Sequence, residues 1–235
     1  MGVDEITGPR EFYDRLAPVY QELYAYPPVM TLRQVVWLER HAPPGPLLDL
    51  GCGPGRILPH LARGGRWAVG LDFSPNMLTL ARQALPEASL VRADAARPLP
   101  FLDASFVAVI SLHATLIHLA DFGDLCQLSR EVARVLRPGG LFLVELPHPR
   151  TFPRTSELGV WRTFRPGIRC RRMASKIEEM CLDEVGGLCT RVRILDLDDL
   201  DEWLSPFARV DLHPGFTGGR FNPKRGLSMV VAAWL

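Results

Sequence analysis

Short apolar runs alternate with amphipathic stretches from residue 47 onward, and this alternation restricts the chain to few folds. The apolar runs read as strands buried on both faces of a sheet, and they cover 47–50, 67–71, 89–92, 106–111 and 141–146. The amphipathic stretches place apolar residues three and four positions apart, as helices do, and they cover 57–63, 75–85 and 122–136. Strands that alternate with helices are joined by right-handed crossovers, so the sequence predicts a mostly parallel, doubly wound α/β sheet.

The segments on either side of this alternating region predict different structure. Two helical patterns, 10–24 and 31–40, precede it, and each is followed by a Pro-Pro pair. After residue 149 the pattern predicts a β-ribbon, a short helix and two final strands, at 168–180 with 188–197, 198–202, 208–212 and 227–235. We therefore expect a single domain in four parts, which are N-terminal helices (1–44), a core (45–148), an insertion (149–197) and a C-terminal completion of the sheet (198–235).

The composition argues against several classes of protein. The 235 residues are 47% hydrophobic and 23% charged, with a formal net charge of +1, which is typical of a globular chain and not of a disordered one. The longest apolar stretch, 106–120, is interrupted by polar residues, and the N-terminus lacks the layout of a signal peptide. The five cysteines, at 52, 126, 170, 181 and 189, form no close pair and no metal-ligand spacing. We therefore expect no membrane span, no bound metal, reduced thiols and a cytoplasmic location.

A glycine-rich loop follows the first strand of the core. Asp49 stands near the end of that strand, and Gly51, Gly53 and Gly55 come next, ahead of a helix. Glycine allows a positive φ and a close approach of a ligand to the backbone, and the N-terminus of the helix offers unpaired N–H groups. A dinucleotide-binding loop would need its third glycine at position 56, where this chain has Arg56. The spacing therefore disfavours an NAD-dependent oxidoreductase, which stays as an alternative.

Carboxylates end three successive predicted strands: Asp49, Asp72 and Asp94. The carboxyl ends of parallel strands meet at one edge of the sheet, where open α/β sheets bind their ligands. A carboxylate at Asp72 can accept hydrogen bonds from both hydroxyls of a ribose, and one at Asp94 can accept from the exocyclic amine of a purine. Because three acids would repel a pyrophosphate, the pattern indicates a cationic nucleoside.

Four sequence blocks in this order resemble the class I S-adenosylmethionine-dependent methyltransferases. The blocks are LLDLGCGPGR (47–56), VGLDFSPNML (69–78), RADAARPLPF (92–101) and LSREVARVLRPGGLFLVE (128–145). These blocks are similar to the corresponding motifs of the small-molecule branch that includes the ubiquinone and menaquinone C-methyltransferases. The resemblance covers residues 10 to about 146. It implies S-adenosyl-L-methionine as the cofactor and a Rossmann-like sheet of seven strands, with an antiparallel last strand, N-terminal lid helices and a β-ribbon inserted after the fifth strand.

The resemblance also implies a set of cofactor-binding residues. Those around the methionine moiety are Asp49, Gly51, Gly53, Gly55 and, through its backbone carbonyl, Ser111. Those around the adenosine are Asp72, Phe73, Met77, Asp94 and Ala95. The segment FYDRLAPVY (12–20) resembles the family's lid helix, so Tyr13 and Tyr20 are expected to close over the cofactor, with core packing as the alternative.

Three histidines are candidates for a general base toward the methyl acceptor. His113, His118 and His148 follow the fourth and fifth strands, where an imidazole could remove a proton from the acceptor, although His118 could instead pack against the next helix. The fourth strand ends in Ser-Leu-His-Ala and lacks the Asn/Asp-Pro-Pro-aromatic run of methyltransferases that modify amino groups of nucleic acids and proteins. This departure favours O- or C-methylation of a small molecule. An RNA or protein methyltransferase and a non-catalytic cofactor-binding protein are the alternatives, and a monomer and a homodimer both stay open.

The resemblance implies that the insertion (149–197) is a cap on the acceptor side, and charge is unevenly distributed over it. Residues 150–172 contain seven arginines and one acid, whereas 178–202 contain nine acids and two arginines. The arginines are Arg150, Arg154, Arg162, Arg165, Arg169, Arg171 and Arg172. They could hold a carboxylated or phosphorylated acceptor, contact RNA, or pair with the acidic stretch across a ribbon. The near-neutral net charge disfavours RNA.

Overall fold

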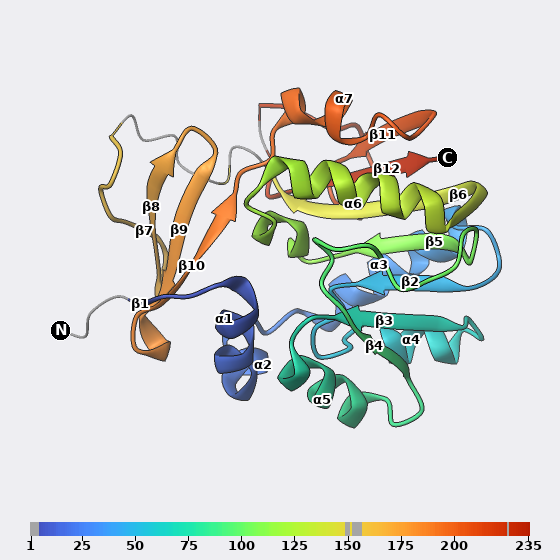
Figure 1. Cartoon of the computed structure of the whole chain (residues 1–235), viewed down its shortest axis with the longest axis horizontal. Coiled ribbons are helices and arrows are strands. Elements are labelled where there is room, and N and C mark those ends of the chain that lie inside the picture. The colour runs from blue at the N-terminus through green and yellow to red at the C-terminus, as the bar shows by residue number, and fades with distance from the viewer. Residues whose placement is uncertain (1–4, 149–150, 152–156, 225) are drawn as a thin grey trace.

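The computed structural model describes residues 5–148, 151, 157–224 and 226–235, and it contains two β-sheets (Figure 1). The larger sheet has seven strands in the order β11-β12-β6-β5-β2-β3-β4. These strands are β2 (Leu47–Leu50), β3 (Ala68–Asp72), β4 (Ser89–Arg92), β5 (Phe106–Ser111), β6 (Leu136–Pro147), β11 (Arg209–His213) and β12 (Ser228–Trp234). Strands β2 to β6 pair in parallel, and β12 runs antiparallel to both of its neighbours. The predicted Rossmann-like sheet with an antiparallel last strand is confirmed.

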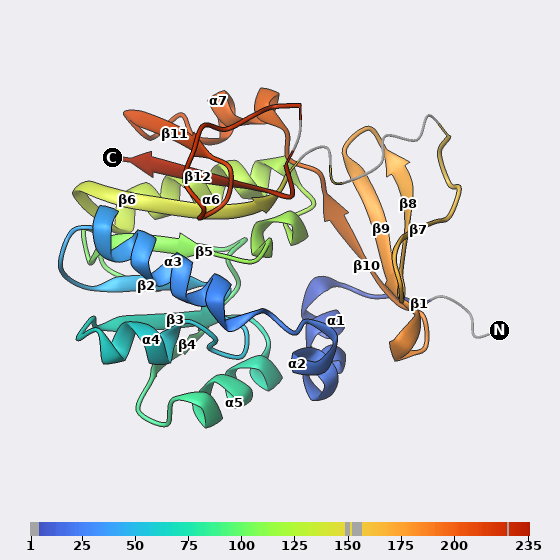
Figure 2. The same ribbon diagram turned by 180° about the vertical axis from the view of Figure 1, so that it is seen from behind.

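Helices cover both faces of this sheet, as Figures 1 and 2 show from opposite sides. They are α3 (Pro28–His41) and α4 (Leu58–Arg63) on one face, and α6 (Phe122–Val135) and α7 (Leu200–Trp203) on the other, while α5 (Pro75–Ala84) lies beside β3 and β4. Alternate residues of β2 pack in opposite directions, because Leu48 and Leu50 join the core under α6 whereas Leu47 joins the core under α3. A strand that is buried on both faces is apolar over most of its length, which explains the short apolar runs in the sequence.

Two local predictions differ from the structure in detail. The helix expected over 10–24 is broken into α1 (Pro9–Leu16), a 3-10 turn (Ala17–Val19) and α2 (Tyr20–Leu23), since Pro18 has no N–H to continue the α-helical pattern. Strand β6 begins at Leu136, ahead of the strand predicted at 141–146, and so includes the Pro-Gly-Gly turn residues at 138–140. The register of β6 against β5 shifts there, so the turn residues form a bulge within the strand.

The smaller sheet corrects the predicted β-ribbon. It has five strands in the order β1-β10-β9-β8-β7, namely β1 (Glu5–Ile6), β7 (Arg162–Arg165), β8 (Ile168–Ala174), β9 (Ile177–Leu182) and β10 (Leu188–Arg193). The run 168–180 was taken as one strand but contains a tight turn at Ser175 and Lys176, which carries no Gly or Pro to mark it. The N-terminal strand β1 adds to the edge of this sheet by pairing in parallel with β10.

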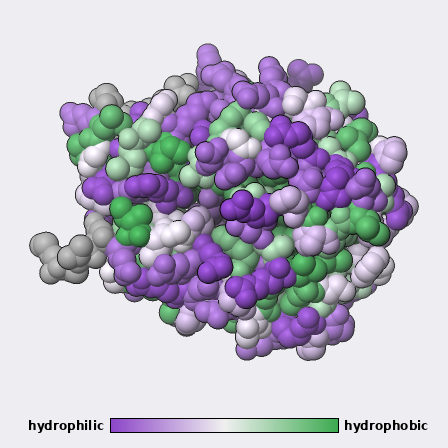
Figure 3. Space-filling view, viewed as in Figure 1, coloured by the Kyte–Doolittle hydropathy of each residue, from purple (hydrophilic) through white to green (hydrophobic). Residues whose placement is uncertain are grey.

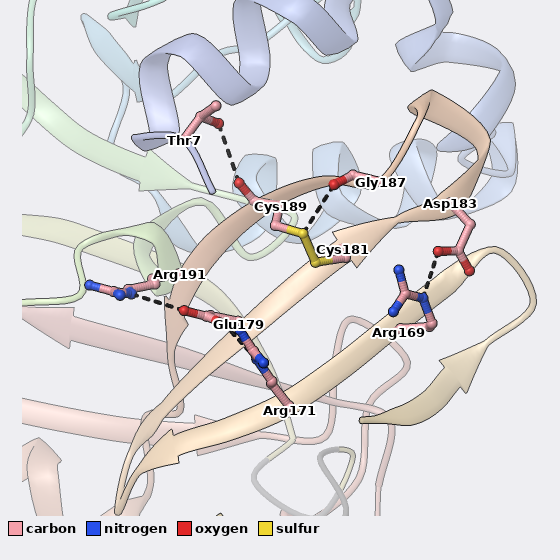
Figure 4. Close-up of a disulfide and its surroundings, with 9 residues drawn as sticks. All are labelled: Thr7, Arg169, Arg171, Glu179, Cys181, Asp183, Gly187, Cys189 and Arg191. Atoms are coloured by element: carbon pink, nitrogen blue, oxygen red, sulfur yellow. Dashed lines mark hydrogen bonds and ion pairs between the residues drawn. A yellow bond between two sulfur atoms is a disulfide. The ribbon is translucent and has the colours of Figure 1, made fainter. Parts of the chain in front are cut away.

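A disulfide joins two strands of the smaller sheet. Cys181 on β9 and Cys189 on β10 stand directly opposite each other with their Cα atoms 4.0 Å apart, and both residues are buried (Figure 4). The expectation that all five thiols are reduced is therefore wrong for this pair, whereas Cys52, Cys126 and Cys170 are free. The eight-residue separation hides the pairing in the sequence, because only the hairpin turn between β9 and β10 brings the two cysteines into register.

We expect the double variant Cys181→Ala/Cys189→Ala to be less stable than the oxidised protein by about 2 kcal/mol, because a closed loop of this length restricts the unfolded chain. Urea unfolding of the two proteins measures the difference, with the free and partly exposed Cys126→Ala as the matched control. Equal midpoints for the oxidised wild type and the double variant would contradict the prediction.

The arginine-rich stretch is paired with acids inside the smaller sheet. Arg171 on β8 and Arg191 on β10 both contact the buried carboxylate of Glu179 on β9, and Arg169 contacts Asp183 (Figure 4). Arg162 on β7 likewise pairs with the buried Glu178. These contacts support the interpretation that the two charged stretches neutralise each other. Arg150 and Arg154 lie outside the described residues, as does the side chain of Arg165.

No helix in the described part of the chain is long and apolar enough to cross a membrane. Hydrophilic and hydrophobic side chains are interspersed over the face shown in Figure 3.

Candidate functional site

A cavity of about 430 Å³ lies at the carboxyl ends of β2, β3 and β5. Helices α1 and α2 cover it from the side of the smaller sheet, and both ribbon views place them between the two sheets. The cavity brings together most of the predicted site residues, which are Tyr13, Tyr20, Asp49, Gly51, Gly53, Asp72, Phe73, Met77, Asp94, Ala95, His113 and His118. Three predicted residues, Gly55, Ser111 and His148, do not line it.

Each glycine of the loop is required for a different reason. Gly51 has a φ of +72°, and a Cβ at this position would lie 2.2 Å from Cγ2 of Thr115. Gly55 has a φ of +73° and packs against α5, where a Cβ would lie 3.1 Å from the Cα of Ala81, so its role is packing of the loop. Gly53 also has a positive φ, of +53°, but a Cβ there would meet nothing within 4 Å. Gly53 therefore presents bare backbone to the open cavity, which leaves room for a ligand at that point.

The Asp72 carboxylate ties this loop to the end of β3. Its Oδ2 accepts a hydrogen bond from the Gly53 N–H at 2.9 Å, and its Oδ1 accepts from the Ser74 N–H at 2.9 Å. Burial raises the pKa of Asp72, although these backbone donors oppose the shift. The Ser74 hydroxyl donates to Asp14 of α1 at 2.5 Å, which anchors the covering helix beside the loop. The carboxylate therefore lies at a fixed position on the cavity wall.

The other two strand-end acids differ in environment. Asp49 is buried, and burial raises its pKa to about 7, while Arg56 lowers it and Asp72 raises it further. Asp94 lies in the loop after β4, where its Oδ1 accepts from the Ala96 N–H at 2.9 Å. A cation in the cavity would favour the ionised form of Asp49, since an opposite charge stabilises a buried carboxylate.

All four tyrosines of the chain line the cavity, at positions 13, 20, 24 and 26. The Tyr20 and Tyr24 rings are stacked with centroids 5.0 Å apart, and Tyr13 lies 6.2 Å from Tyr20. Burial raises the pKa of Tyr13 and Tyr20, and it raises that of Tyr26 to about 12, so these phenols stay neutral at physiological pH. Tyr24 and Tyr26 were not among the predicted site residues. The four-residue spacing from Tyr20 to Tyr24, one helical turn, was an available signal for the first of them.

The three histidines have different surroundings. His113 lines the cavity with its ring edge-on to Tyr26, at 4.9 Å between centroids. His118 contacts the Tyr13 hydroxyl through Nε2 at 2.7 Å, and burial lowers its pKa to about 4. His148 is buried away from the cavity, with its Nε2 3.0 Å from the Asn222 carbonyl oxygen, because the C-terminal loop folds over its ring. The candidate role of His148 as a base is therefore not supported.

Ser111 also has a packing role. Its buried hydroxyl donates to the Leu50 carbonyl oxygen at 3.0 Å and so links β5 to β2, while the next residue, Leu112, lines the cavity. Arg56 is a cavity residue that the sequence analysis used only to reject a dinucleotide loop. Its guanidinium lies 4.2 Å above the Tyr26 ring, next to the tyrosine wall.

Comparisons with known proteins agree with this geometry. Residues 48–144 match a family model described as a methyltransferase domain. The chain is 32% identical over 137 residues to YqeM of Bacillus subtilis, a match that covers 57% of this chain and 55% of that protein. It is 37% identical over 113 residues to the demethylmenaquinone methyltransferase of Tropheryma whipplei, covering 45% and 44%. The chain thus spans about half the length of the curated relatives it matches.

The fold has a counterpart among solved structures. The CcbJ methyltransferase of Streptomyces caelestis superimposes with a TM-score of 0.74 at 21% identity, and the match covers 94% of this chain and 96% of that one. Residues 48–144 therefore match a methyltransferase domain, and the chain around them has the fold of a solved methyltransferase.

Proposed function

We propose that this chain methylates a small-molecule acceptor, and that the cavity beneath α1 and α2 binds both the cofactor and the acceptor. The observation that carries the proposal is the bare backbone of Gly53 beside the fixed Asp72 carboxylate. A ribose against Asp72 would bring the rest of the cofactor across Gly53, where the backbone leaves room for it.

The described residues fit S-adenosyl-L-methionine at both of its ends. Toward the adenosine, Asp72 would hold the ribose, Asp94 and Ala95 would face the adenine amine, and Phe73 and Met77 would contact the ring. Toward the methionine moiety, Asp49 would hold the ammonium group, and the Arg56 guanidinium would hold the carboxylate. The bound cofactor supplies a sulfonium methyl group that is already activated for in-line displacement.

The protein would then mainly align the acceptor and exclude water. The tyrosine wall and the covering helices supply this enclosure. If the acceptor must lose a proton, His113 is the better candidate base, since it lines the cavity beside Tyr26. His118 has a pKa lowered to about 4 and is engaged by Tyr13, so we assign it to positioning of that tyrosine. A histidine base suits an O–H or an activated C–H acceptor, which agrees with the O- or C-methylation favoured by the sequence.

The insertion (149–197) is proposed to lie on the acceptor side, as the domain division above expects. None of its described residues lines the cavity, so it would act by supporting the covering segment. Thr7 shows the link, because its hydroxyl donates to the Cys189 carbonyl oxygen at 3.3 Å (Figure 4). The Thr7 N–H donates to the same oxygen at 2.9 Å, and the next residue, Gly8, lines the cavity.

Calorimetry with S-adenosyl-L-homocysteine and with NAD tests the cofactor, and methyl transfer from radiolabelled cofactor to a metabolite extract tests the reaction. We expect binding of S-adenosyl-L-homocysteine alone and a labelled product of low molecular mass. Binding of NAD without S-adenosyl-L-homocysteine would overturn the proposal. Label that appeared only in RNA or protein would instead indicate an RNA or protein methyltransferase. Cofactor binding without any labelled product would favour a non-catalytic protein.

Replacing Asp72 by Ala is expected to weaken S-adenosyl-L-homocysteine binding by about 1–3 kcal/mol, because charged hydrogen bonds to the ribose are lost. Calorimetry measures the change. Asp103→Ala is a suitable control, since Asp103 is an exposed acid paired with Arg134 outside the cavity. Unchanged affinity in Asp72→Ala would place the ribose elsewhere.

A further inference from the structure

A buried polar network lies behind the methionine end of the cavity, and its centre is Glu145 on β6. This residue is 7% exposed and does not line the cavity. Its Oε2 accepts hydrogen bonds from the side-chain amide of Gln34 on α3 at 2.8 Å and from the His113 N–H at 3.1 Å. Its Oε1 accepts from the Tyr26 hydroxyl at 3.5 Å. One carboxylate therefore contacts a helix and two residues of the cavity wall.

Gln34 connects this carboxylate to Arg56. The amide is fully buried, with its Nε2 donating to Glu145 and to the Tyr26 hydroxyl at 2.9 Å, while its Oε1 accepts from Nη1 of Arg56 at 2.8 Å. These partners fix the amide orientation, because the opposite orientation would place NH₂ against the guanidinium and oxygen against the carboxylate. Arg56 is held further by Thr31, whose hydroxyl accepts from the same Nη1 at 2.7 Å.

This relay of hydrogen bonds, from Glu145 through Gln34 to Arg56, leaves part of the Arg56 guanidinium available to a ligand. Both side-chain hydrogen bonds that the structure gives Arg56 use Nη1, so within the described residues Nη2 and Nε have no such partner. A direct ion pair with Glu145 would instead have occupied the fork that binds a carboxylate. The neutral Gln34 keeps the two charges apart and still couples their positions.

Glu145 also restrains an unusual stretch of backbone. His113 and Ala114 both have positive φ angles, of +57° and +64°. Such conformations cost free energy in residues other than glycine and persist only where the surroundings hold them. Here the Glu145 side chain accepts from the His113 N–H, and the Glu145 carbonyl oxygen accepts from the Ala114 N–H at 3.1 Å. The same residue thus fixes both members of the turn that presents His113 to the cavity.

We propose that Glu145 is a positioning residue at the methionine end of the cofactor site, where it sets Arg56 through Gln34 and His113 directly. This inference rests on the proposed cofactor site, in which Arg56 holds the carboxylate. It extends that site by two residues that lie outside the cavity and carry no chemistry of their own.

The test compares two ligands that differ only at the methionine end. S-adenosyl-L-homocysteine carries the ammonium and carboxylate groups, whereas 5′-methylthioadenosine has the same adenosine and thioether without them. We expect Glu145→Gln to weaken S-adenosyl-L-homocysteine binding by about tenfold and to change 5′-methylthioadenosine binding by less than about twofold. Gln34→Met removes the relay with a side chain of similar length and should give the same selective loss.

The double variant adds a further readout. If Glu145 acts through Gln34, Glu145→Gln/Gln34→Met should be no weaker toward S-adenosyl-L-homocysteine than the weaker single variant, because the two losses share one cause. Glu131→Gln is the matched control, since Glu131 also accepts a backbone N–H, at 2.8 Å, and pairs with an arginine, but it lies away from the cavity. It should leave both affinities unchanged.

The outcomes separate this inference from the cofactor proposal. Wild-type protein that binds neither ligand would overturn the cofactor site and the positioning role together. Wild-type protein that binds both, with variants that lose both ligands equally or neither, would overturn the positioning role alone, since a general loss of stability would not discriminate between the ligands. Selective loss of S-adenosyl-L-homocysteine in Gln34→Met supports the role even if Glu145→Gln fails to fold.

Discussion

Replacing Gly53 by Ala is expected to weaken S-adenosyl-L-homocysteine binding by at least about a hundredfold while the protein remains folded. The added Cβ would meet no protein atom within 4 Å, so the fold can accept it apart from the strain of a positive φ, about 1 kcal/mol or slightly more. The same Cβ would stand in the space that the cofactor needs beside Asp72. Calorimetry and a thermal unfolding scan on the same sample measure the two effects.

Variants of two other glycines separate the effect of backbone strain from the effect of filling the ligand space. Gly186 has a φ of +71° in the turn before β10, away from the cavity, and a Cβ there also meets nothing within 4 Å. Gly186→Ala therefore carries the backbone strain alone and should bind the ligand as the wild type does. Gly51→Ala should lose stability as well as binding, because of the 2.2 Å approach to Thr115. Gly53→Ala protein that binds as tightly as Gly186→Ala would show that the cofactor does not cross this loop.

The sheet and the cofactor side of the cavity could be predicted because their signals are local. A strand buried on both faces is apolar over most of its length, so β2, β3 and β5 are visible as runs in the sequence. The glycines follow β2 and Asp72 ends β3, and the parallel arrangement brings them to one edge. Each signal is contained in about ten neighbouring residues, and the alternation of strands with helices then predicts the parallel sheet.

The β1 edge of the smaller sheet could not be predicted because its contacts are distant in the sequence. Strand β1 has two residues and is placed only by its partner β10, and the Thr7 hydrogen bond to Cys189 spans 182 positions. No periodicity exists in two residues. The disulfide was missed for another reason, since Cys181 and Cys189 are only eight residues apart and become partners only once the hairpin register is known.

The buried network was missed for a different reason. Glu145 lies in an apolar run, and Gln34 lies among the apolar residues of a helix, so each is a single polar residue within a core pattern. Their meaning depends on meeting each other and Arg56, and those three residues come from α3, β6 and the loop between β2 and α4. A polar residue at a core position is a signal that a partner exists, but the sequence does not name the partner.

Affinity for S-adenosyl-L-homocysteine is expected to fall by about tenfold per pH unit as the pH is lowered below 7. In the free protein, burial raises the pKa of Asp49 to about 7, so the acid is largely protonated at lower pH. The ligand ammonium would favour the carboxylate and lower its pKa in the complex, so binding releases a proton in this range. Calorimetry in two buffers of different ionisation enthalpy measures the released proton directly.

The variant Asp49→Asn tests whether Asp49 is the group that causes the pH dependence of binding. The variant should bind more weakly than the wild type at pH 8 and equally at pH 5.5, and its affinity should vary little between those values. Asp72 also has a raised pKa, so a wild-type pH dependence that persisted in Asp49→Asn would assign it to Asp72 instead. An affinity that stays flat from pH 8 to pH 5.5 in the wild type would mean that no ammonium group approaches Asp49.

The free protein should respond to pH in the opposite sense, which gives an independent check. A folded-state pKa of about 7 lies above the value of an unfolded Asp, about 3.9, so between these values the folded state holds the proton more tightly. The contribution of Asp49 to stability is therefore largest at low pH and is lost as the pH rises through 7. Lowering the pH from 8 to 6 should stabilise the wild type relative to Asp49→Asn. The same change should weaken the affinity of the wild type for S-adenosyl-L-homocysteine. Opposite signs in one pH range would show that the burial of Asp49, which costs stability in the free protein, serves to attract the cationic cofactor.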